Sequence, residues 1–155
     1  FPTEVGQLEF LLWEPIMVGH YINHEIDRED DKSDEEYLQD VRTALASGVS
    51  LSGAISDYFL ENLRHNVHLN EGDSPLLASI SLGKLNIAKL LITAGAKAKD
   101  TREANKIVSE CQSTVGVDIL AYLFKFDALN KLHGNLLRIR SLSNSSWISK
   151  ENLMI

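Results

Sequence analysis

The stretch SPLLASISLGKLNIAKLLITAGAKAKD, which spans residues 74–100, contains two short amphipathic patterns of helical spacing. Ser74 is a preferred helix N-cap and Pro75 a preferred first helical residue, so the first helix is predicted to run from here to Gly83. The apolar residues of the second helix recur at i, i+3, i+4 and i+7 until Gly95, a residue type that commonly ends helices. The stretch therefore predicts an antiparallel pair of helices joined by a tight turn.

This pair resembles one ankyrin repeat, and the resemblance extends without a gap over about residues 72–99. The residues Ser74-Pro75-Leu76 stand where the family has threonine, proline and leucine, and Gly83 matches the glycine between its two helices. Leu90-Leu91 match the paired leucines, and Gly95-Ala96 match the closing glycine and alanine. The resemblance implies an all-α fold in which helical hairpins stack as a solenoid and share a core.

Two positions depart from the ankyrin pattern. Leu77 replaces the usual histidine, and Ser79-Ile80 replace a pair of alanines. The missing histidine removes a side-chain hydrogen bond that usually ties neighbouring repeats, whereas the apolar packing is preserved.

A weaker copy of the hairpin is predicted further along the chain. Asp100 with Glu103 forms a capping-box pattern for one helix, and a second helix is expected to begin at Gly116. A spacing of 33 residues maps Gly83, Leu90 and Leu91 onto Gly116, Leu123 and Phe124, and a spacing of 31 maps Leu76, Leu77 and Ile80 onto Ile107, Val108 and Cys111. Periods of this size indicate a repeat architecture.

Upstream of the clear repeat, Ser33 opens a capping box that predicts a helix ending at Gly48. The distance from Gly48 to Gly72 is longer than an ordinary repeat requires. The apolar residues within it predict an inserted helix from Ala54 to His65.

The N-terminal region is expected to cap the solenoid. A helix is predicted from Thr3 to Trp13, ended by Pro15, and a second helix over 16–26. A charged loop over 27–35 follows. These boundaries divide the chain into N-terminal helices and an acidic loop (1–32), a degenerate ankyrin-repeat domain (33–140), which ends in a helix over 129–139, and a Ser/Asn-rich segment (141–155).

Composition limits the classes of protein that this chain can represent. Of its 155 residues, 44% are hydrophobic and 24% charged, as in an ordinary globular domain, and no apolar run is long enough to span a bilayer. Cys111 is the only cysteine, which excludes an internal disulfide and favours a reducing, intracellular and cytoplasmic location. Because the chain starts at Phe1, we expect it to be a piece of a longer protein.

The charged residues are unevenly distributed. The formal net charge is −7, and residues 25–36 hold eight acidic residues against Arg28 and Lys32. Phosphate backbones would be repelled here, which disfavours nucleic acid as a partner. Two interpretations of the acidic loop stay open: a docking tail or cation site, and a solvated loop that places negative charge near the next helix N-terminus.

No signature of a common enzyme class is present, since the sequence lacks H-E-x-x-H, G-x-S-x-G, a P-loop and G-x-G-x-x-G. The alternative to a binding module is a metal-dependent enzyme. Its ligands to zinc or iron would come from His20, His24, Glu25, His65 and His68. This spacing is common by chance, and we expect no metal and no cofactor.

A nucleophile and base could also be formed by Cys111 and His133. Cys111 falls on the apolar face of its predicted helix, where a thiol usually serves as a small core residue.

The ankyrin resemblance implies a protein-protein interaction module without chemistry of its own. Such a module would belong to a larger adaptor or to a bacterial effector acting in the host cytosol, and a structural spacer is a third reading. In the family, partners contact the turns before each first helix and the exposed side of that helix. Carried onto this sequence, the contact residues are the turn residues Asn70, Glu71, Asp73, Asp100, Thr101 and Arg102 and the helix positions Ser81 and Leu82.

Overall fold

The computed structural model describes residues 5–23, 32–113 and 117–129, and within these ranges it contains seven α-helices and no β-strand. This part of the chain is all-α, which confirms the predicted class. The helices in chain order are α1 (Gln7–Met17), α3 (Asp34–Ala46), α4 (Asp57–Glu61), α5 (Pro75–Ser81), α6 (Leu85–Thr93), α7 (Thr101–Ser113) and α8 (Val117–Lys125). None of the helices in these ranges has both the length and the apolar character needed to cross a membrane.

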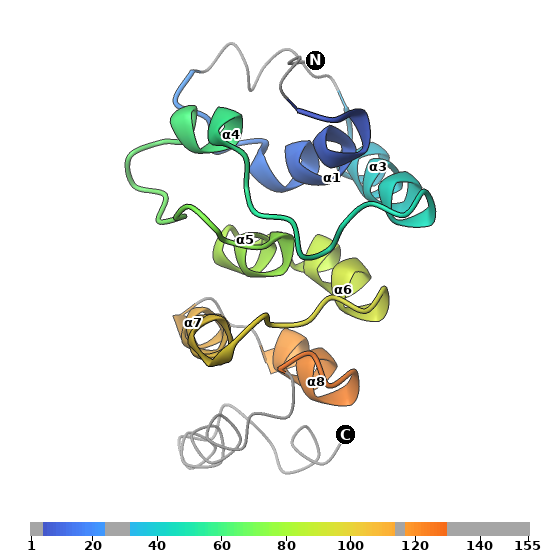
Figure 1. Cartoon of the computed structure of the whole chain (residues 1–155), viewed down its shortest axis with the longest axis vertical. Coiled ribbons are helices and arrows are strands. Elements are labelled where there is room, and N and C mark those ends of the chain that lie inside the picture. The colour runs from blue at the N-terminus through green and yellow to red at the C-terminus, as the bar shows by residue number, and fades with distance from the viewer. Residues whose placement is uncertain (1–4, 24–31, 114–116, 130–155) are drawn as a thin grey trace.

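Six of the helices are arranged as three pairs, one below the other in Figure 1. Helix α1 packs against α3, α5 against α6, and α7 against α8. Along the molecule, α5 also contacts α1 and α7, while α6 contacts α3 and α8. The pairs therefore form two columns, with α1, α5 and α7 in one and α3, α6 and α8 in the other.

Helices α5 and α6 form the predicted hairpin. The Ser74 hydroxyl accepts a hydrogen bond from the Leu77 N–H at 3.3 Å, and Pro75 occupies the first helical position. Gly83, at φ 74°, takes the left-handed conformation through which the chain turns into α6. The start signal and the turn predicted for this hairpin are confirmed.

The chain leaves α3, α6 and α8 in the same way. Each helix is followed by a residue with positive φ: Gly48 at 84°, Gly95 at 104° and Asp127 at 54°. The next residue donates its N–H to the carbonyl five positions back, as in a Schellman motif. These bonds run from Val49 to Ala44, from Ala96 to Leu91 and from Ala128 to Leu123, at 3.1, 2.9 and 2.8 Å.

The equivalent helix ends correct the predicted register of the second helices. Leu91 and Leu123 hold the same position and are both 0% exposed, so the spacing is 32 residues rather than 33. The predicted matches of Leu90 with Leu123 and of Leu91 with Phe124 are wrong, because the side chain that faces the core decides the register. Leu90 and Phe124 are only half-buried. Gly116 lies outside the described residues, and the predicted apolar face of α7 is buried at Ile107, Val108 and Cys111.

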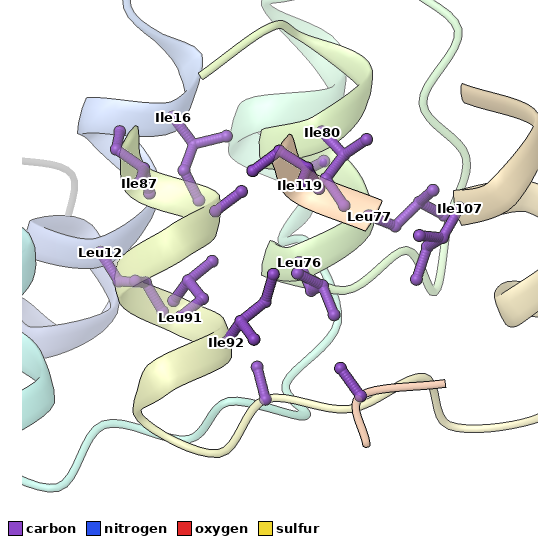
Figure 2. Close-up of a cluster of buried hydrophobic side chains, with 14 of the residues drawn as sticks. Leu12, Ile16, Leu76, Leu77, Ile80, Ile87, Leu91, Ile92, Ile107 and Ile119 are labelled. Atoms are coloured by element: carbon purple, nitrogen blue, oxygen red, sulfur yellow. The ribbon is translucent and has the colours of Figure 1, made fainter. Parts of the chain in front are cut away.

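The hydrophobic core runs through all three pairs of helices (Figure 2). Helix α6 lies between its neighbours, and side chains from five helices meet around it. They are Leu12 and Ile16 from α1, Leu76, Leu77 and Ile80 from α5, Ile87, Leu91 and Ile92 from α6, Ile107 from α7 and Ile119 from α8, each at most 5% exposed. Each pair therefore buries its apolar residues against the next one.

Helix α1 is shifted from its predicted position between Thr3 and Trp13. It continues through Pro15, which was expected to end it. Proline cannot donate a backbone hydrogen bond to the carbonyl four positions back. Ile16 and Met17 are nevertheless fully buried, and their packing keeps the last turn helical. Thr3 lies outside the described residues.

The helix predicted over residues 16–26 does not form as such. The chain turns at Gly19, which has φ 90°, and Tyr21 then pairs with Leu63 in an isolated antiparallel bridge. Tyr21 is fully buried, so a distant extended segment supplies the backbone partners that a helix would otherwise supply. The flanking bonds join the Ile22 N–H to the Asn62 carbonyl at 2.7 Å and the Arg64 N–H to the His20 carbonyl at 2.9 Å.

The inserted helix is shorter than predicted, since α4 has five residues in place of the range Ala54 to His65. Leu63 belongs to the antiparallel bridge, and the helix ends before it. The predicted apolar residues Ile55, Phe59 and Leu63 are buried all the same. The ring of Phe59 lies 6.1 Å from that of Trp13, so the inserted segment packs on α1.

The capping box predicted at the start of α3 is present. The Ser33 hydroxyl accepts the Glu36 N–H at 3.2 Å, and the Glu36 carboxylate accepts the Ser33 N–H at 3.3 Å. Three other predicted segments lie wholly or mostly outside the described residues: the charged loop over 27–35, the helix over 129–139 and the Ser/Asn-rich segment 141–155.

We predict that Leu91→Ala lowers the free energy of unfolding by about 2–5 kcal/mol, because it removes a fully buried side chain. Leu90→Ala should cost less, since Leu90 is half-buried. Asn86→Ala, at an exposed position of the same helix, should change stability by no more than about 0.5 kcal/mol. Urea unfolding followed by circular dichroism measures all three, and a larger cost for Leu90→Ala than for Leu91→Ala would contradict the register.

Candidate interaction site

A polar pocket of about 140 Å³ lies between the loop before α5 and the first turn of α7. It contains five of the six turn residues expected to contact a partner: Asn70, Glu71, Asp73, Asp100 and Arg102. Thr101 is exposed beside them without lining the pocket. The remaining lining residues are Leu77, Lys99, Glu103 and Lys106.

Asp73 fixes the loop on one side of this pocket. Its Oδ2 accepts the Asn70 N–H at 2.8 Å, and the Asp73 N–H donates to the Asn70 carbonyl at 3.1 Å. Its Oδ1 lies 3.8 Å from Lys106 Nζ, which belongs to α7. Asp73 is only 7% exposed, so these contacts stabilise a nearly buried charge.

Glu103 links the two sides of the pocket. It is 4% exposed, and its Oε1 accepts hydrogen bonds from the Ser74 hydroxyl at 3.0 Å and the Lys99 N–H at 3.4 Å. Its own N–H donates to Asp100 Oδ1 at 2.8 Å, which is one half of the predicted capping box. The carboxylate thus joins the cap of α5 to the start of α7. The capping pattern could identify Glu103 as a helix-start residue, but no sequence signal connected it to Ser74.

Lys99 closes the pocket from a third direction. Its Nζ donates to the Gly72 carbonyl at 2.6 Å and lies 3.9 Å from Glu103 Oε2. The loop before α5 and the connection before α7 are therefore held together by a side chain from each. A surface supported in this way is preorganised, which lowers the entropy lost when a partner binds.

Glu71 and Arg102 lie at the rim of this supported surface. Both are exposed, and neither forms an ion pair within the described residues. A rim that carries one acidic and one basic group can select a partner by charge complementarity. These two side chains are the part of the pocket best placed to meet another protein.

The structure places Ser81 and Leu82 away from this pocket. They lie at the C-terminal end of α5, whereas the pocket is formed at its N-terminal end. Leu82 is half-buried and packs against the core. The eight predicted contact residues are therefore not one continuous set.

The histidines of the metal hypothesis are only partly described. His65 and His68 are exposed and His20 is half-buried, while His24 and Glu25 lie outside the described residues. Within residues 5–23, 32–113 and 117–129, no group of three or more His, Cys, Asp or Glu side chains is placed to hold a metal ion.

Cys111 is 1% exposed, as expected for a core thiol. Desolvation by burial, with a smaller effect of the Glu110 charge, raises the pKa of the Cys111 thiol from 9.0 to about 12. A nucleophilic cysteine has a lowered pKa, so this environment opposes activation. His133, its proposed base, lies outside the described residues.

We predict that Ser74→Ala destabilises the protein more than Ser33→Ala. Both changes remove a helix cap, at about 0.5–2 kcal/mol each. Only Ser74→Ala also leaves the buried Glu103 carboxylate without a donor, at a further cost of about 1–3 kcal/mol. Chemical denaturation of the two variants measures the difference, and equal losses would mean that the Ser74–Glu103 hydrogen bond contributes nothing.

We also predict that Cys111 reacts slowly with iodoacetamide at pH 8 in the folded protein and rapidly in urea. The raised pKa keeps the folded thiol protonated at this pH, and burial blocks the reagent. Mass spectrometry of labelled protein over time gives both rates. Fast labelling without denaturant would show an accessible, activated cysteine.

Comparison with known proteins gives no relative, since no protein-family model, no curated protein and no solved structure matches this chain.

Proposed function

We propose that this chain is a protein-protein interaction module, built as an ankyrin-like solenoid of helical hairpins, and that its partner docks on the rim of the polar pocket. As proposed, binding is its activity, and it works as one region of a larger adaptor or effector. The solenoid part of the proposal is supported by the resemblance of residues 72–99 to an ankyrin repeat. It is further supported by the three stacked helix pairs and the recurring helix ends.

One observation carries the docking part of the proposal. Two exposed and oppositely charged side chains, Glu71 and Arg102, stand on a framework held by Asp73, Lys99 and Glu103. The framework residues use their charges on one another, whereas the rim residues do not. Rim charges of this kind steer encounter and fix which partner fits, and the supporting framework keeps their separation constant.

The test is capture of binding proteins on the immobilised chain, compared between the unaltered protein and a Glu71→Arg, Arg102→Glu double variant. The charge exchange should reduce the amount of retained partner by roughly tenfold or more through charge mismatch. Thermal stability should change by no more than about 0.5 kcal/mol, as is usual for surface residues.

A matched control is available on α3, where Arg42 Nη1 and Glu35 Oε1 are 3.1 Å apart on an exposed surface. The Glu35→Arg, Arg42→Glu exchange has the same charge types and should leave capture unchanged. If capture survives the exchange at Glu71 and Arg102 but is lost on neutralising Glu29, Asp30 and Asp31, the acidic loop is the docking element.

A further inference from the structure

The connections that leave α3 and α6 run in the same direction across the molecule, from the column of α3 and α6 toward the column of α5 and α7 (Figure 1). They also begin in the same register. Val49 and Ala96 each follow a left-handed glycine and donate to the carbonyl five positions back. By this equivalence, Leu51 in the first connection corresponds to Ala98 in the second.

A backbone hydrogen bond joins the second connection to the third but has no counterpart between the first and the second. The Ala98 N–H donates to the Ala128 carbonyl at 2.7 Å. The equivalent bond would run from the Leu51 N–H to the Ala96 carbonyl. Neither group makes a hydrogen bond in the described part of the chain. A donor and an acceptor are thus left open on facing extended segments.

A groove of about 490 Å³ lies where this bond is missing. Its apolar lining comes from Val49, Leu51, Ala96 and Ala98, whose side chains are small or half-buried. Its only charged lining residues are Lys97 and Lys99. The groove is therefore basic on a chain whose formal net charge is −7.

We propose that this groove binds an extended segment of another protein that carries aliphatic and acidic side chains in alternation. An added strand presents N–H and carbonyl groups along its edge, so it can satisfy both the Ala96 carbonyl and the Leu51 N–H. Alternate side chains of a strand point to opposite sides. Aliphatic residues then face the apolar lining, and a carboxylate lies beside the exposed ammonium group of Lys97.

The groove is a different surface from the polar pocket, and only Lys99 lines both. The inference does not depend on docking at Glu71 and Arg102. Lys97 is the better group to alter, because Lys99 is already engaged with the Gly72 carbonyl and Glu103.

The test uses a fluorescein-labelled octapeptide that alternates valine and glutamate, with binding followed by fluorescence anisotropy. We expect saturable binding that Lys97→Glu weakens by at least about tenfold, because it places like charges together. Arg102→Glu is the matched control, since it makes the same charge change on the other surface and should leave the affinity unchanged. Circular dichroism establishes that both variants remain folded.

Two further peptides test the geometry. A version with N-methylated valines keeps the side chains but loses backbone donors, and an alternating valine–lysine version reverses the charge. Neither should bind. Equal binding of the N-methylated peptide, or no binding of the first peptide, would overturn the proposal.

Two other results would also overturn it, and each identifies a different occupant or site. If affinity is lost in Arg102→Glu but kept in Lys97→Glu, the peptide docks at the polar pocket. If the protein instead self-associates in light scattering and Lys97→Glu is monomeric, the groove is occupied by a second copy of this chain.

Discussion

The burial of α6 against its neighbours is the contact on which the rest of the structure depends. This helix has nine residues and its partner α5 has seven, and helices of this length are marginal in water by themselves. Leu91 and Ile92 are covered by side chains from the adjacent helices rather than by solvent. Short helices are therefore stable here only as members of the stack. The polar pocket depends on the same contact, since α5 must sit beside α7 before Ser74 can reach Glu103.

Local signals in the sequence predicted the parts of the fold that local chemistry decides. The Ser33 and Ser74 caps and the glycines after the helices lie where expected, because each cap or turn is specified within a few residues. The apolar positions Phe59 and Ile107 were also correctly predicted to be buried. These features require no knowledge of what the helix packs against.

The errors all have a tertiary cause. Pro15 remains helical because the residues after it are buried, and Tyr21 is extended because its backbone partner lies forty residues away at Leu63. The register of α8 follows the buried face rather than the aligned leucines. The candidate site shows the same division. Its turn residues were predicted from the resemblance, whereas the Ser74–Glu103 link and the position of Leu82 depend on packing between pairs.

The connection from α3 to α5 has 28 residues, four times the 7 residues that join α6 to α7. The entropy of loop closure grows only with the logarithm of length, so two doublings cost about 1 kcal/mol. Phe59, buried beside Trp13, is enough to offset a cost of that size, since a buried aromatic ring contributes roughly 1.5–3 kcal/mol. The chain can therefore depart from the stack, form its own small contact with α1 and return at the next level without weakening the array. In evolutionary terms, the junction after Gly48 is a place where such an array can acquire new sequence while the helices on either side keep their packing.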